Sequence, residues 1–399
     1  MMSIKSDFPI FTIHSDLVYL DSASTTHKPN FVIEQTNQYI SSSYANIGRG
    51  SYPLAMQSED IYDASKSAAA KLINSTAEQI IYTHSSTYAY NMLAYSLVES
   101  SILTRWSSII LSTVEHHANL VIWQKLSQTY GFIIRLVGLD EDGGLDYGQL
   151  ESLLDNSVTV VSLTGASNVT GMLTDIARVR SMIWPERFLI IDGSQLVPNR
   201  RTDVQTLWID ALVWTAHKMM GYTGLGVLYL SRSRMSRLTP PRIGGAVIDT
   251  VTRDGYTLQS GSIAWEPGTP NLIAAASYLY ALQYFDLIGW YEWWEKYEQE
   301  LIEYTLEKFA QQDRLILVNN QSEHRLWVFS FYLSDASSIL QLGEKLWQQW
   351  ICIRTWGHCA HPLIEQLGHG QLGRLSLYVY STKEDVDRFF EAIKNPTNS

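Results

Sequence analysis

Two charged residues, each at the end of an apolar, strand-like segment, are the strongest chemical signal in this sequence. Asp192 ends the segment 188–192, and Lys218 follows the segment 211–217. A buried carboxylate beside a buried lysine is costly unless both serve a charged group held between them. Pyridoxal phosphate is such a group, because a lysine forms its Schiff base and an aspartate pairs with its ring nitrogen. Charged strand ends also occur in ordinary α/β sheets, so the pair alone leaves both interpretations open.

Two further segments carry polar residues directly after an apolar run. Ser86 and Thr87 follow the run 80–83 and precede a helical pattern, where hydroxyl and backbone N–H groups can bind a phosphate or simply cap the helix. His116 follows the run 109–111 and could stack on a pyridine ring. His116 and His117 could also bind a metal, but no cysteine or carboxylate cluster with ligand spacing accompanies them. The sequence therefore predicts no metal site.

Composition and charge narrow the class of protein. The chain has 399 residues, of which 46% are apolar and 17% are charged, so it can bury a large core and form two domains. Its 13 tryptophans and 23 tyrosines suggest extensive burial, which can include a subunit interface. The formal net charge of −11 favours neither nucleic acid nor an anionic membrane as a partner.

The expected compartment is the cytoplasm. No apolar run approaches the ~20 residues that span a bilayer, and the first residues lack the apolar centre of a signal peptide. The two cysteines, Cys352 and Cys359, do not form a disulfide framework and fit a reducing environment. Cys352 lies in an apolar run and is expected to be a core residue.

The elements that must position these residues alternate along the chain. Helical patterns at 60–73, 119–130 and 148–154 lie between successive strand-like runs. The runs cover residues 80–83, 109–112, 133–137, 158–163, 189–192, 211–215 and 226–230. This alternation predicts a doubly wound, mostly parallel α/β sheet that gathers its ligands at the carboxyl ends of the strands. Every candidate named so far lies at such an end.

The pattern changes at the turn-rich segment 266–271. A long helical region follows at 272–311, then strand-like runs at 315–318, 326–332 and 375–379, and a final helix at 383–394. We therefore predict a large α/β domain formed by residues 20–265. Residues 1–19 and 266–399 are predicted to form a smaller α+β domain.

A set of motifs, taken together and in order, resembles one enzyme family. The chain is similar to the cysteine desulfurases of the fold-type I, class V aminotransferase superfamily, in particular the SufS/CsdA-like branch that includes selenocysteine lyases. The motifs cover residues 19–29, 115–124, 167–171, 192–195, 217–218, 266–271, 354–360 and 374–380. The resemblance thus extends over nearly the whole chain and implies a pyridoxal phosphate enzyme of fold type I.

The resemblance implies a role for each residue that would contact the cofactor. Lys218 would hold the cofactor covalently, Asp192 would pair with its ring nitrogen, and His116 would stack on its ring. Gln195 would bind its phenolic oxygen. The implied phosphate ligands are Ser86, Thr87, Thr215, His217 and, from the partner subunit of a homodimer, Thr269.

The resemblance also implies how the substrate, L-cysteine, is held and attacked. Asn168, Arg354 and Arg374 are the expected substrate-binding residues, with Arg374 forming a bidentate pair with the α-carboxylate. Cys359 would be the nucleophile, so that Lys218, Cys359 and His116 form the expected catalytic set. Its thiolate would take the sulfur as a persulfide and release L-alanine. His358 and Arg354 are the neighbours that could stabilise the thiolate.

The implied function is sulfur supply for iron–sulfur cluster assembly or a related thiolation pathway. The short interval between Arg354 and Arg374 resembles the SufS-like branch, which implies a SufE- or SufU-like protein as the sulfur acceptor. The alternatives are a selenocysteine lyase acting on L-selenocysteine, a C–S lyase, an epimerase, an aminotransferase, or a catalytically weak homologue.

The sequence departs from the family pattern at several positions. Around the nucleophile the family usually reads Arg-Thr/Val-Gly-His-His-Cys, whereas this chain has Trp356 in place of the glycine and Gly357 in place of the first histidine. Gly48 stands where the family has a histidine, and the usual arginine is absent at Ala264. Residues 83–88 differ from the family's phosphate loop. These departures do not affect the lysine, the aspartate, Arg374 or the cysteine.

Overall fold

A seven-stranded mixed sheet forms the centre of the molecule, as seen in the computed structural model, which describes residues 4–289, 291, 294–335, 337–368 and 370–394. The strand order is β2-β8-β7-β6-β5-β3-β4. The strands are β2 (Ile80–Thr83), β3 (Ser108–Ser112), β4 (Ile133–Val137), β5 (Val158–Thr164), β6 (Phe188–Asp192), β7 (Ala211–Thr215) and β8 (Gly226–Leu230). Only β8 in this sheet runs against its neighbours. The prediction of a doubly wound, mostly parallel sheet is confirmed.

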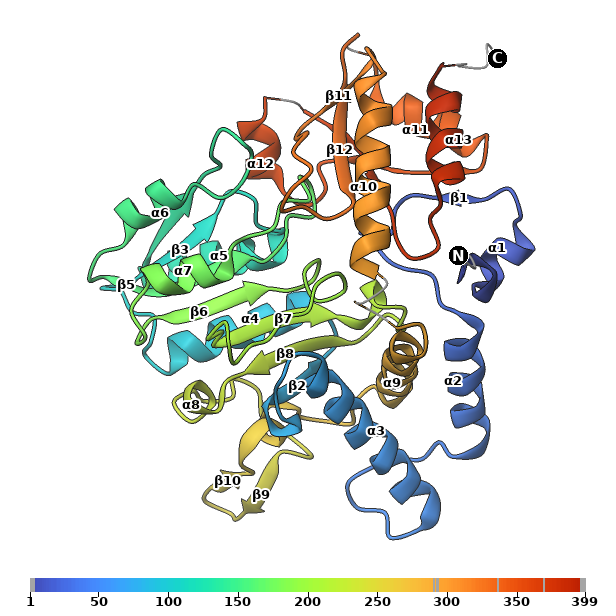
Figure 1. The fold of residues 1–399 in the computed structure, drawn as a ribbon. Helices are drawn as coiled ribbons and strands as arrows, with labels where there is room; N and C mark the ends of the chain where they lie inside the picture. Colours follow the sequence, from blue (N-terminus) through green and yellow to red (C-terminus); the bar gives the residue numbers. More distant parts are fainter. Residues whose placement is uncertain (1–3, 290, 292–293, 336, 369, 395–399) are drawn as a thin grey trace.

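Helices cover both faces of this sheet (Figure 1). Successive side chains of a strand point to opposite faces, and the buried residues of β6 follow this rule: Ile190 joins one hydrophobic cluster, and Leu189 and Ile191 join the other. The first cluster includes residues of α4 (Ser86–Glu99) and α5 (Val121–Tyr130). The second includes residues of α3 (Pro53–Leu72), α7 (Ile176–Met182) and α9 (Leu272–Leu287).

A second, antiparallel sheet lies beside the first and has the order β11-β12-β15-β14 (Figure 1). Its strands are β11 (Leu315–Leu317), β12 (Val328–Leu333), β14 (Arg354–Trp356) and β15 (Leu372–Ser376). The helices of this part are α10 (Trp294–Ala310), α11 (Ile339–Trp347), α12 (His361–Gln366) and α13 (Lys383–Lys394). The strand expected at 375–379 is displaced: its pairing with β14 ends at Arg374 and its pairing with β12 ends at Ser376, and residues 377–380 are buried outside the strand.

The N-terminal segment joins this second part of the molecule. After α1 (Pro9–Ile13), the strand β1 (Val18–Tyr19) pairs in parallel with β13 (Ile351–Cys352). An isolated bridge then connects Asp21 to Ser376 at the end of β15. The residues that follow β1 therefore lie against the strand that carries Arg374.

The single helical region expected at 272–311 is two helices, α9 and α10. Ile288 caps α9, and Gly289 follows with a φ of +67°, a left-handed conformation that glycine adopts without strain and that often ends a helix. Helix α9 packs against α2 (Asn30–Ser42) and α3. The division into domains at residues 265 and 266 stays a prediction.

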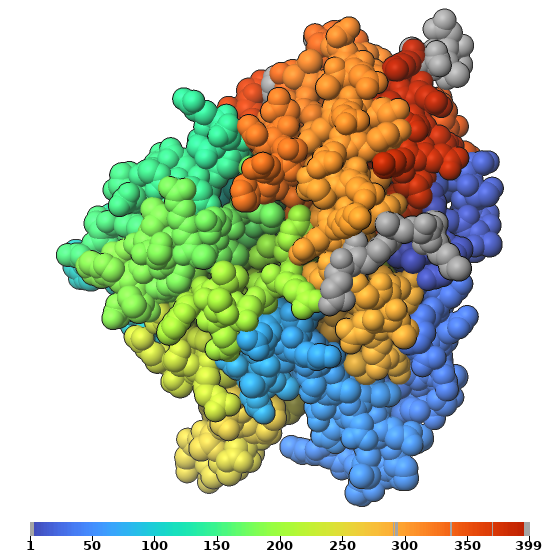
Figure 2. Space-filling view, viewed as in Figure 1, coloured from blue at the N-terminus to red at the C-terminus, as the bar shows by residue number. Residues whose placement is uncertain are grey.

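Three short elements complete this part of the molecule: α6 (Tyr147–Leu153), α8 (Arg232–Met235), which bonds to the segments just before β6 and β7, and a hairpin of β9 (Ile248–Val251) and β10 (Tyr256–Leu258). The hairpin projects from the molecule near α3, as the yellow segment in Figure 2 shows. Among the helices that the structure describes, none combines the length and the apolar character needed to cross a membrane.

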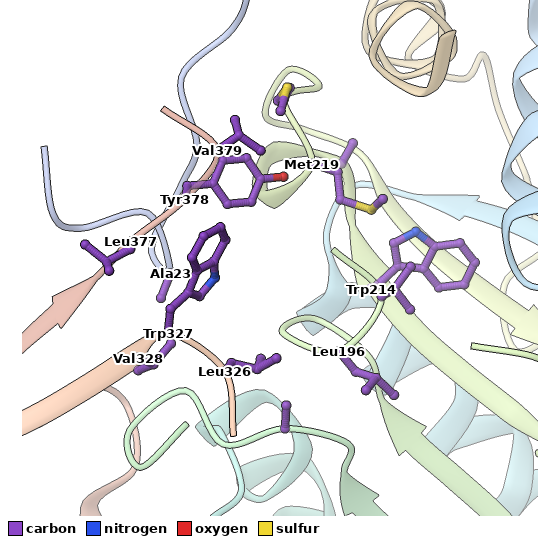
Figure 3. Packing of buried hydrophobic residues seen from close by; sticks show 14 of the residues in the cluster. Ala23, Leu196, Trp214, Met219, Leu326, Trp327, Val328, Leu377, Tyr378 and Val379 are labelled. Carbon is purple, nitrogen blue, oxygen red and sulfur yellow. The ribbon is translucent and has the colours of Figure 1, made fainter. Parts of the chain in front are cut away.

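The two sheets share one hydrophobic core. Trp327 and Tyr378 belong to the second part of the molecule, and they join the same buried cluster as Trp214 and Met219 from the large sheet (Figure 3). The ring centroids of Trp327 and Tyr378 are 5.9 Å apart. The Nε1 atom of Trp214 donates a hydrogen bond to Tyr278 of α9 at 2.7 Å. This packing fixes the second sheet against the strand ends that carry the candidate site.

Candidate active site

Asp192 and Lys218 lie at the ends of neighbouring parallel strands. Asp192 ends β6 opposite Val213 of β7, and Lys218 ends the 3-10 turn that follows β7. Burial lowers the pKa of Lys218 to about 8, although the charge of Asp192 acts in the opposite direction. No hydrogen bond or ion pair engages the Lys218 ammonium within the described part of the chain. The amine is thus available for covalent chemistry near neutral pH.

The Asp192 carboxylate is fully enclosed and has few partners. Its Oδ1 accepts a hydrogen bond from the backbone N–H of Ser194 at 2.9 Å. Burial raises its pKa, while the Ser194 hydrogen bonds and the charge of Lys218 act against this rise. A protonated ring nitrogen of the cofactor beside the Asp192 carboxylate would offset the cost of burying that charge. This fits the expected pairing of Asp192 with the ring nitrogen.

His116 is held as a neutral ring. Its Nδ1 accepts the backbone N–H of Ala118 at 3.1 Å, so the proton of the neutral ring lies on Nε2. Burial lowers its pKa to about 3, and the positive charge of Lys218 is the next cause. A neutral imidazole can lie against a pyridine ring without the cost of burying a second charge, which fits the predicted role.

A buried glutamate beside His116 was missed by the sequence reasoning. Glu115 accepts hydrogen bonds from Ser112 (2.5 Å), Asn119 (2.6 Å) and the backbone N–H of Thr164 (2.8 Å). Burial raises its pKa to about 8. These bonds tie the segment that carries His116 to β3 and β5. The only signal in the sequence was a carboxylate placed directly before the histidine pair.

The expected phosphate ligands lie at the start of α4 and after β7. Ser85 is the N-cap of α4 and accepts the backbone N–H of Tyr88 at 3.2 Å. Ser86 and Thr87 therefore occupy the first helical positions, where free backbone N–H groups favour an anion. A Cβ atom on Gly226 would lie 2.2 Å from the Ser85 carbonyl carbon. Only glycine lets β8 approach this loop so closely.

Three further expected ligands lie near the ends of β6 and β7: Thr215 is the last residue of β7, and Gln195 and His217 follow β6 and β7. Thr215 and Gln195 are buried, and their side chains donate to the carbonyls of Leu225 (3.1 Å) and Ala23 (2.8 Å). The Nδ1 atom of His217 is buried without a partner, and burial lowers the pKa of this histidine to about 3. Such an orphaned polar atom is explained by a ligand. Together with the unpaired Lys218 amine, it fits a phosphate-bearing aldehyde cofactor.

Thr269 lies apart from this cluster within one chain. It is exposed and lines a surface hollow with Gly48, Arg49, Gly245 and Ile263. The backbone N–H of Gly268 donates to the carbonyl of Gly245 at 2.8 Å. The structure of one subunit does not bring Thr269 to Lys218, so its expected contribution across a dimer stays a prediction.

Arg354 and Arg374 lie directly opposite each other on β14 and β15. Both donate to the hydroxyl of Ser24, at 2.8 Å and 2.7 Å respectively. Arg374 also forms an ion pair with Asp21 at 2.9 Å, and its buried Nε has no partner. The sequence reasoning missed Asp21 and Ser24, although both belong to the motif at 19–29. They orient two guanidinium groups that can bind a carboxylate.

Asn168 connects the arginine to the cysteine loop. Its carbonyl accepts a hydrogen bond from Arg374 at 2.9 Å, and its side-chain Nδ2 donates to the carbonyl of His358 at 2.9 Å. The charge of Cys359 also influences the pKa of Lys218, which places the cysteine within electrostatic reach of the lysine. The structure therefore brings Lys218, Asn168, Arg374 and the cysteine loop together, as the sequence predicted.

The cysteine loop has an unusual backbone. Trp356, His358 and Cys359 all have positive φ angles, of 137°, 47° and 55°. The Trp356 side chain is 56% exposed, so it projects into solvent. The Nε2 atom of His358 lies 3.1 Å from the carbonyl of Leu372, and burial lowers its pKa to about 3. A neutral His358 adds no positive charge beside Cys359, which leaves Arg374, Arg354 and Lys218 as the nearby cations.

Two other sequence predictions concern metal and Cys352. In the described residues no three histidine, cysteine or acidic side chains come together in a way that could hold a metal ion. Cys352 is half-buried in β13 and packs against the main hydrophobic core, as the apolar run around it indicated.

Comparison with known proteins gives consistent matches over the whole chain. A family model described as aminotransferase class V matches residues 18–389. The cysteine desulfurase of Pectobacterium atrosepticum is 34% identical over 397 residues, which cover 98% of this chain and 96% of that protein. The cysteine desulfurase of Haloferax volcanii is 30% identical over 409 residues, which cover 98% and 95%.

Two solved structures resemble this one over nearly their full length. The apo structure of a cysteine desulfurase from Thermococcus onnurineus has a TM-score of 0.93 and 26% identity, and the match covers 98% of this chain and 96% of that one. The cysteine desulfurase CsdA of Escherichia coli, in its S-sulfonic acid form, has a TM-score of 0.89 and 29% identity, with 98% and 97% covered.

Proposed function

Because the chain belongs to the aminotransferase class V family, we propose that it is a pyridoxal phosphate-dependent cysteine desulfurase. It converts L-cysteine to L-alanine and carries the sulfur as a persulfide on Cys359. One observation carries this proposal: Asn168 bonds both to Arg374, at 2.9 Å, and to the carbonyl of His358, the residue before Cys359, at 2.9 Å. A substrate carboxylate bound at Arg374 is thereby held at a fixed position relative to the nucleophile.

When pyridoxal phosphate is bound, the residues that the sequence singled out would hold it. Lys218 would bind it covalently, Asp192 would pair with its ring nitrogen, His116 would lie on its ring, and Gln195 would bind its phenolic oxygen. Pyridoxal phosphate, when bound, supplies the electron sink that weakens the bond between Cβ and sulfur of the substrate. Its phosphate would be held by Ser86, Thr87, Thr215, His217 and, in a homodimer, the Thr269 of the second copy.

Substrate binding and proton transfer are carried out by side chains of this protein. Arg374 and Arg354 bind the substrate α-carboxylate, and Asn168 keeps Arg374 in place. The free Lys218 amine would take the Cα proton of the substrate and return it, since its pKa of about 8 suits proton transfer near neutral pH. His116, a neutral ring with its proton on Nε2, can hold the ring of the cofactor without adding charge.

Sulfur transfer is a displacement at the substrate sulfur. The Cys359 thiolate attacks this atom, and an S–S bond forms while the bond between sulfur and Cβ breaks. The bonding electron pair leaves with the carbon, which gains a proton and departs as part of L-alanine. Only the thiolate can do this, so the nearby positive charges of Arg354 and Lys218 support the step.

The partners follow from the same chemistry. A persulfide on a short, internally bonded loop needs an acceptor that reaches it, so we propose a SufE- or SufU-like protein as the acceptor. Iron–sulfur cluster assembly or a related thiolation pathway in the cytoplasm is the proposed destination of the sulfur. L-selenocysteine is an alternative substrate of the same site.

The decisive experiment compares the wild type with Cys359→Ala. Alanine and sulfide are measured from L-cysteine in the presence of a thiol reductant, after the visible absorbance has shown that the cofactor is bound. We expect Cys359→Ala to lose at least about 100-fold in both products, because the nucleophile is removed, while the matched variant Cys352→Ala retains them.

Two outcomes would contradict the proposal. Equal activity in the wild type and Cys359→Ala would indicate a C–S lyase that eliminates sulfide without a nucleophilic cysteine. Cofactor binding without any alanine release would indicate an epimerase, an aminotransferase or a catalytically weak homologue. Replacing L-cysteine by L-selenocysteine in the same assay identifies a selenocysteine lyase.

A further inference from the structure

A pair of histidines lies beside the cysteine loop and has no part in the chemistry described above. His117 follows His116, and His361 begins α12 two residues after Cys359. The Nδ1 atom of His361 lies 2.9 Å from Nε2 of His117, and the backbone N–H of His361 donates to the same Nε2 at 3.3 Å. The two ring planes are inclined by 23°. Nε2 of His117 is therefore the acceptor of both bonds.

His117 is also bonded to the nucleophile residue itself. Its backbone N–H donates to the carbonyl of Cys359 at 2.8 Å. One residue thus holds the chain at two points, Cys359 through its main chain and His361 through its side chain. We call this arrangement of His117, His361 and the Cys359 carbonyl the histidine clasp.

The backbone of the loop explains why a clasp is needed. Three residues of the loop, Trp356, His358 and Cys359, have positive φ angles, which residues other than glycine adopt only with strain. Such a conformation persists only when its surroundings hold it. The histidine clasp supplies hydrogen bonds at Cys359 and at His361, and the bond from Asn168 to the carbonyl of His358 holds the loop just before Cys359.

Gly357 makes room for the clasp. A Cβ atom at this position would lie 2.9 Å from Nε2 and 3.1 Å from Cδ2 of His361. The imidazole of His361 therefore occupies the space that a side chain at 357 would enter. The glycine, which departs from the family pattern, and the His361 ring are two parts of one arrangement.

We propose that the histidine clasp positions Cys359 for sulfur transfer, with His361 filling the space left by the missing side chain at Gly357. The inference rests on the proposed function for its chemistry but on hydrogen bonds and packing for its structure. His117 and His361 are positioning residues, because their contacts are to the loop.

The first test measures the loop directly and needs no turnover. The rate at which iodoacetamide alkylates Cys359 is followed by mass spectrometry in the holoenzyme, with Cys352→Ala as the common background. We expect His361→Leu to change this rate at least about fivefold, because the side-chain donor to His117 and the imidazole ring are both lost. His361→Asn should keep the wild-type rate, since its amide nitrogen lies where Nδ1 lies in histidine.

The second test measures chemistry in a single turnover. We expect His361→Leu to form the Cys359 persulfide from L-cysteine about 10 to 100 times more slowly, because a small displacement of a nucleophile has effects of this size. The affinity for L-cysteine should stay unchanged, since Arg374 is untouched, and His361→Asn should restore the rate. His117→Gln, whose amide oxygen replaces the Nε2 acceptor, should behave like His361→Asn.

A double substitution tests the role of Gly357. Gly357→Ala alone should disturb the loop as His361→Leu does, because its methyl group enters the space of the His361 ring. In a His361→Ala background the same change should have little further effect, so the two effects should not add. If His361→Leu does not fold, which a thermal melt and the cofactor absorbance would reveal, Gly357→Ala and His117→Leu serve in its place.

The outcomes separate this proposal from the proposed function. If the wild type, His361→Leu and His361→Asn had equal alkylation and persulfide rates, the histidine clasp would be overturned. It would also be overturned if His361→Leu and His361→Asn changed these rates by the same factor. If the wild type releases no alanine from L-cysteine, the proposed function fails, but the alkylation rates still decide whether the clasp holds the loop.

Discussion

At the scale of single residues, the chemistry of this site comes from burial. Lys218 has a lowered pKa, Asp192 has a raised one, and His116 and His217 stay neutral, and in each case burial is the first cause. A surface lysine or histidine of the same sequence context would have none of these properties. The identities of these residues could be read from the sequence, but their protonation depends on the folded protein.

The lowered pKa of Lys218 predicts how the apoenzyme takes up its cofactor. Only the neutral amine attacks an aldehyde, so the uptake rate should rise with pH up to about 8 and then level off. An ordinary lysine, with a pKa of about 10.4, would give a rate that keeps rising beyond pH 10. Stopped-flow absorbance after mixing apoenzyme with pyridoxal phosphate measures this rate. A tenfold rise per pH unit beyond pH 9 would contradict the assignment.

Arg374 should be sensitive even to a change that keeps its charge. A lysine has only three donors, all on one nitrogen, so it cannot keep the bonds to Asp21, Ser24 and Asn168 and also bind a carboxylate with two parallel bonds. We expect Arg374→Lys to lower kcat/KM for L-cysteine about 10- to 100-fold, which corresponds to the loss of charge-assisted hydrogen bonds. Steady-state kinetics measure this effect, and the exposed Arg105→Lys is the control. Equal kinetics in both variants would contradict the role of Arg374.

At the scale of elements, close approach of backbones decides where side chains lie. β8 can pass the start of α4 only because Gly226 has no side chain. The strand predicted at 226–230 was found, yet no local pattern connects its first residue with Ser85. Such contacts between segments far apart in sequence are what local patterns cannot supply.

A methyl group at Gly226 should therefore displace the phosphate loop. Its Cβ would lie 2.2 Å from the carbonyl carbon and 2.6 Å from the backbone nitrogen of the adjacent residues Ser85 and Ser86, and backbone atoms cannot move aside cheaply. We expect Gly226→Ala to destabilise the protein by about 1–3 kcal/mol through overpacking and to weaken cofactor binding. Thermal unfolding and cofactor titration test this, with Gly255→Ala, where nothing lies within 4 Å, as the control. A melting temperature like that of the control would contradict the expectation.

The elements themselves were largely predictable. Each strand of the large sheet overlaps a predicted run, because a strand covered on both faces reads as a short, continuous apolar segment. The strand predictions are wrong where pairing between segments far apart in the sequence, and not the local apolar pattern, decides where a strand ends. Residues 377–379 have the composition of a strand but lie past the end of the ladder at Ser376. β1 and β13, of two residues each, are too short to have a periodic signal and exist only because they pair with each other.

The candidate site was predictable to the extent that its residues have distinctive chemistry. Lys218, Asp192, Asn168, Arg374 and the cysteine loop come together as expected, because the motifs that carry them were read as a set. Asp21, Ser24, Glu115 and His361 escaped notice, since each acts by supporting another residue. A supporting role depends on distance in space, and one sequence contains no information about that distance.

At the scale of the whole molecule, several large apolar side chains remain exposed in one chain. Leu54, Met56, Ile243 and Ile263 are each between 44% and 57% exposed. Ile263 lines the same surface hollow as Thr269 and Gly245. Exposed apolar side chains are typical of a subunit interface, and Ile263 lies on the face from which Thr269 is expected to reach a second copy.

The homodimer is tested by placing a charge on this face. The wild type should sediment as a dimer at micromolar concentration, and Ile263→Asp should weaken the dimer at least about tenfold, because a carboxylate would be buried without a partner. The variant should also retain its cofactor less well if Thr269 completes the phosphate site of the other subunit. Ile13→Asp, at a position that is 72% exposed, is the control. A monomeric wild type with fully bound cofactor would contradict this arrangement.

The pairing of β1 with β13 also has a consequence for the order in which the protein is made. Asp21 and Ser24 leave the ribosome early, but their partners Arg354 and Arg374 emerge near the end of synthesis. Domains generally fold as the chain grows from its N-terminus. The carboxylate site must therefore wait for almost the entire polypeptide, whereas Asp192 and Lys218 meet through strands that follow each other directly. A ribosome that stops before residue 354 releases a chain with the lysine but with neither arginine nor the nucleophile.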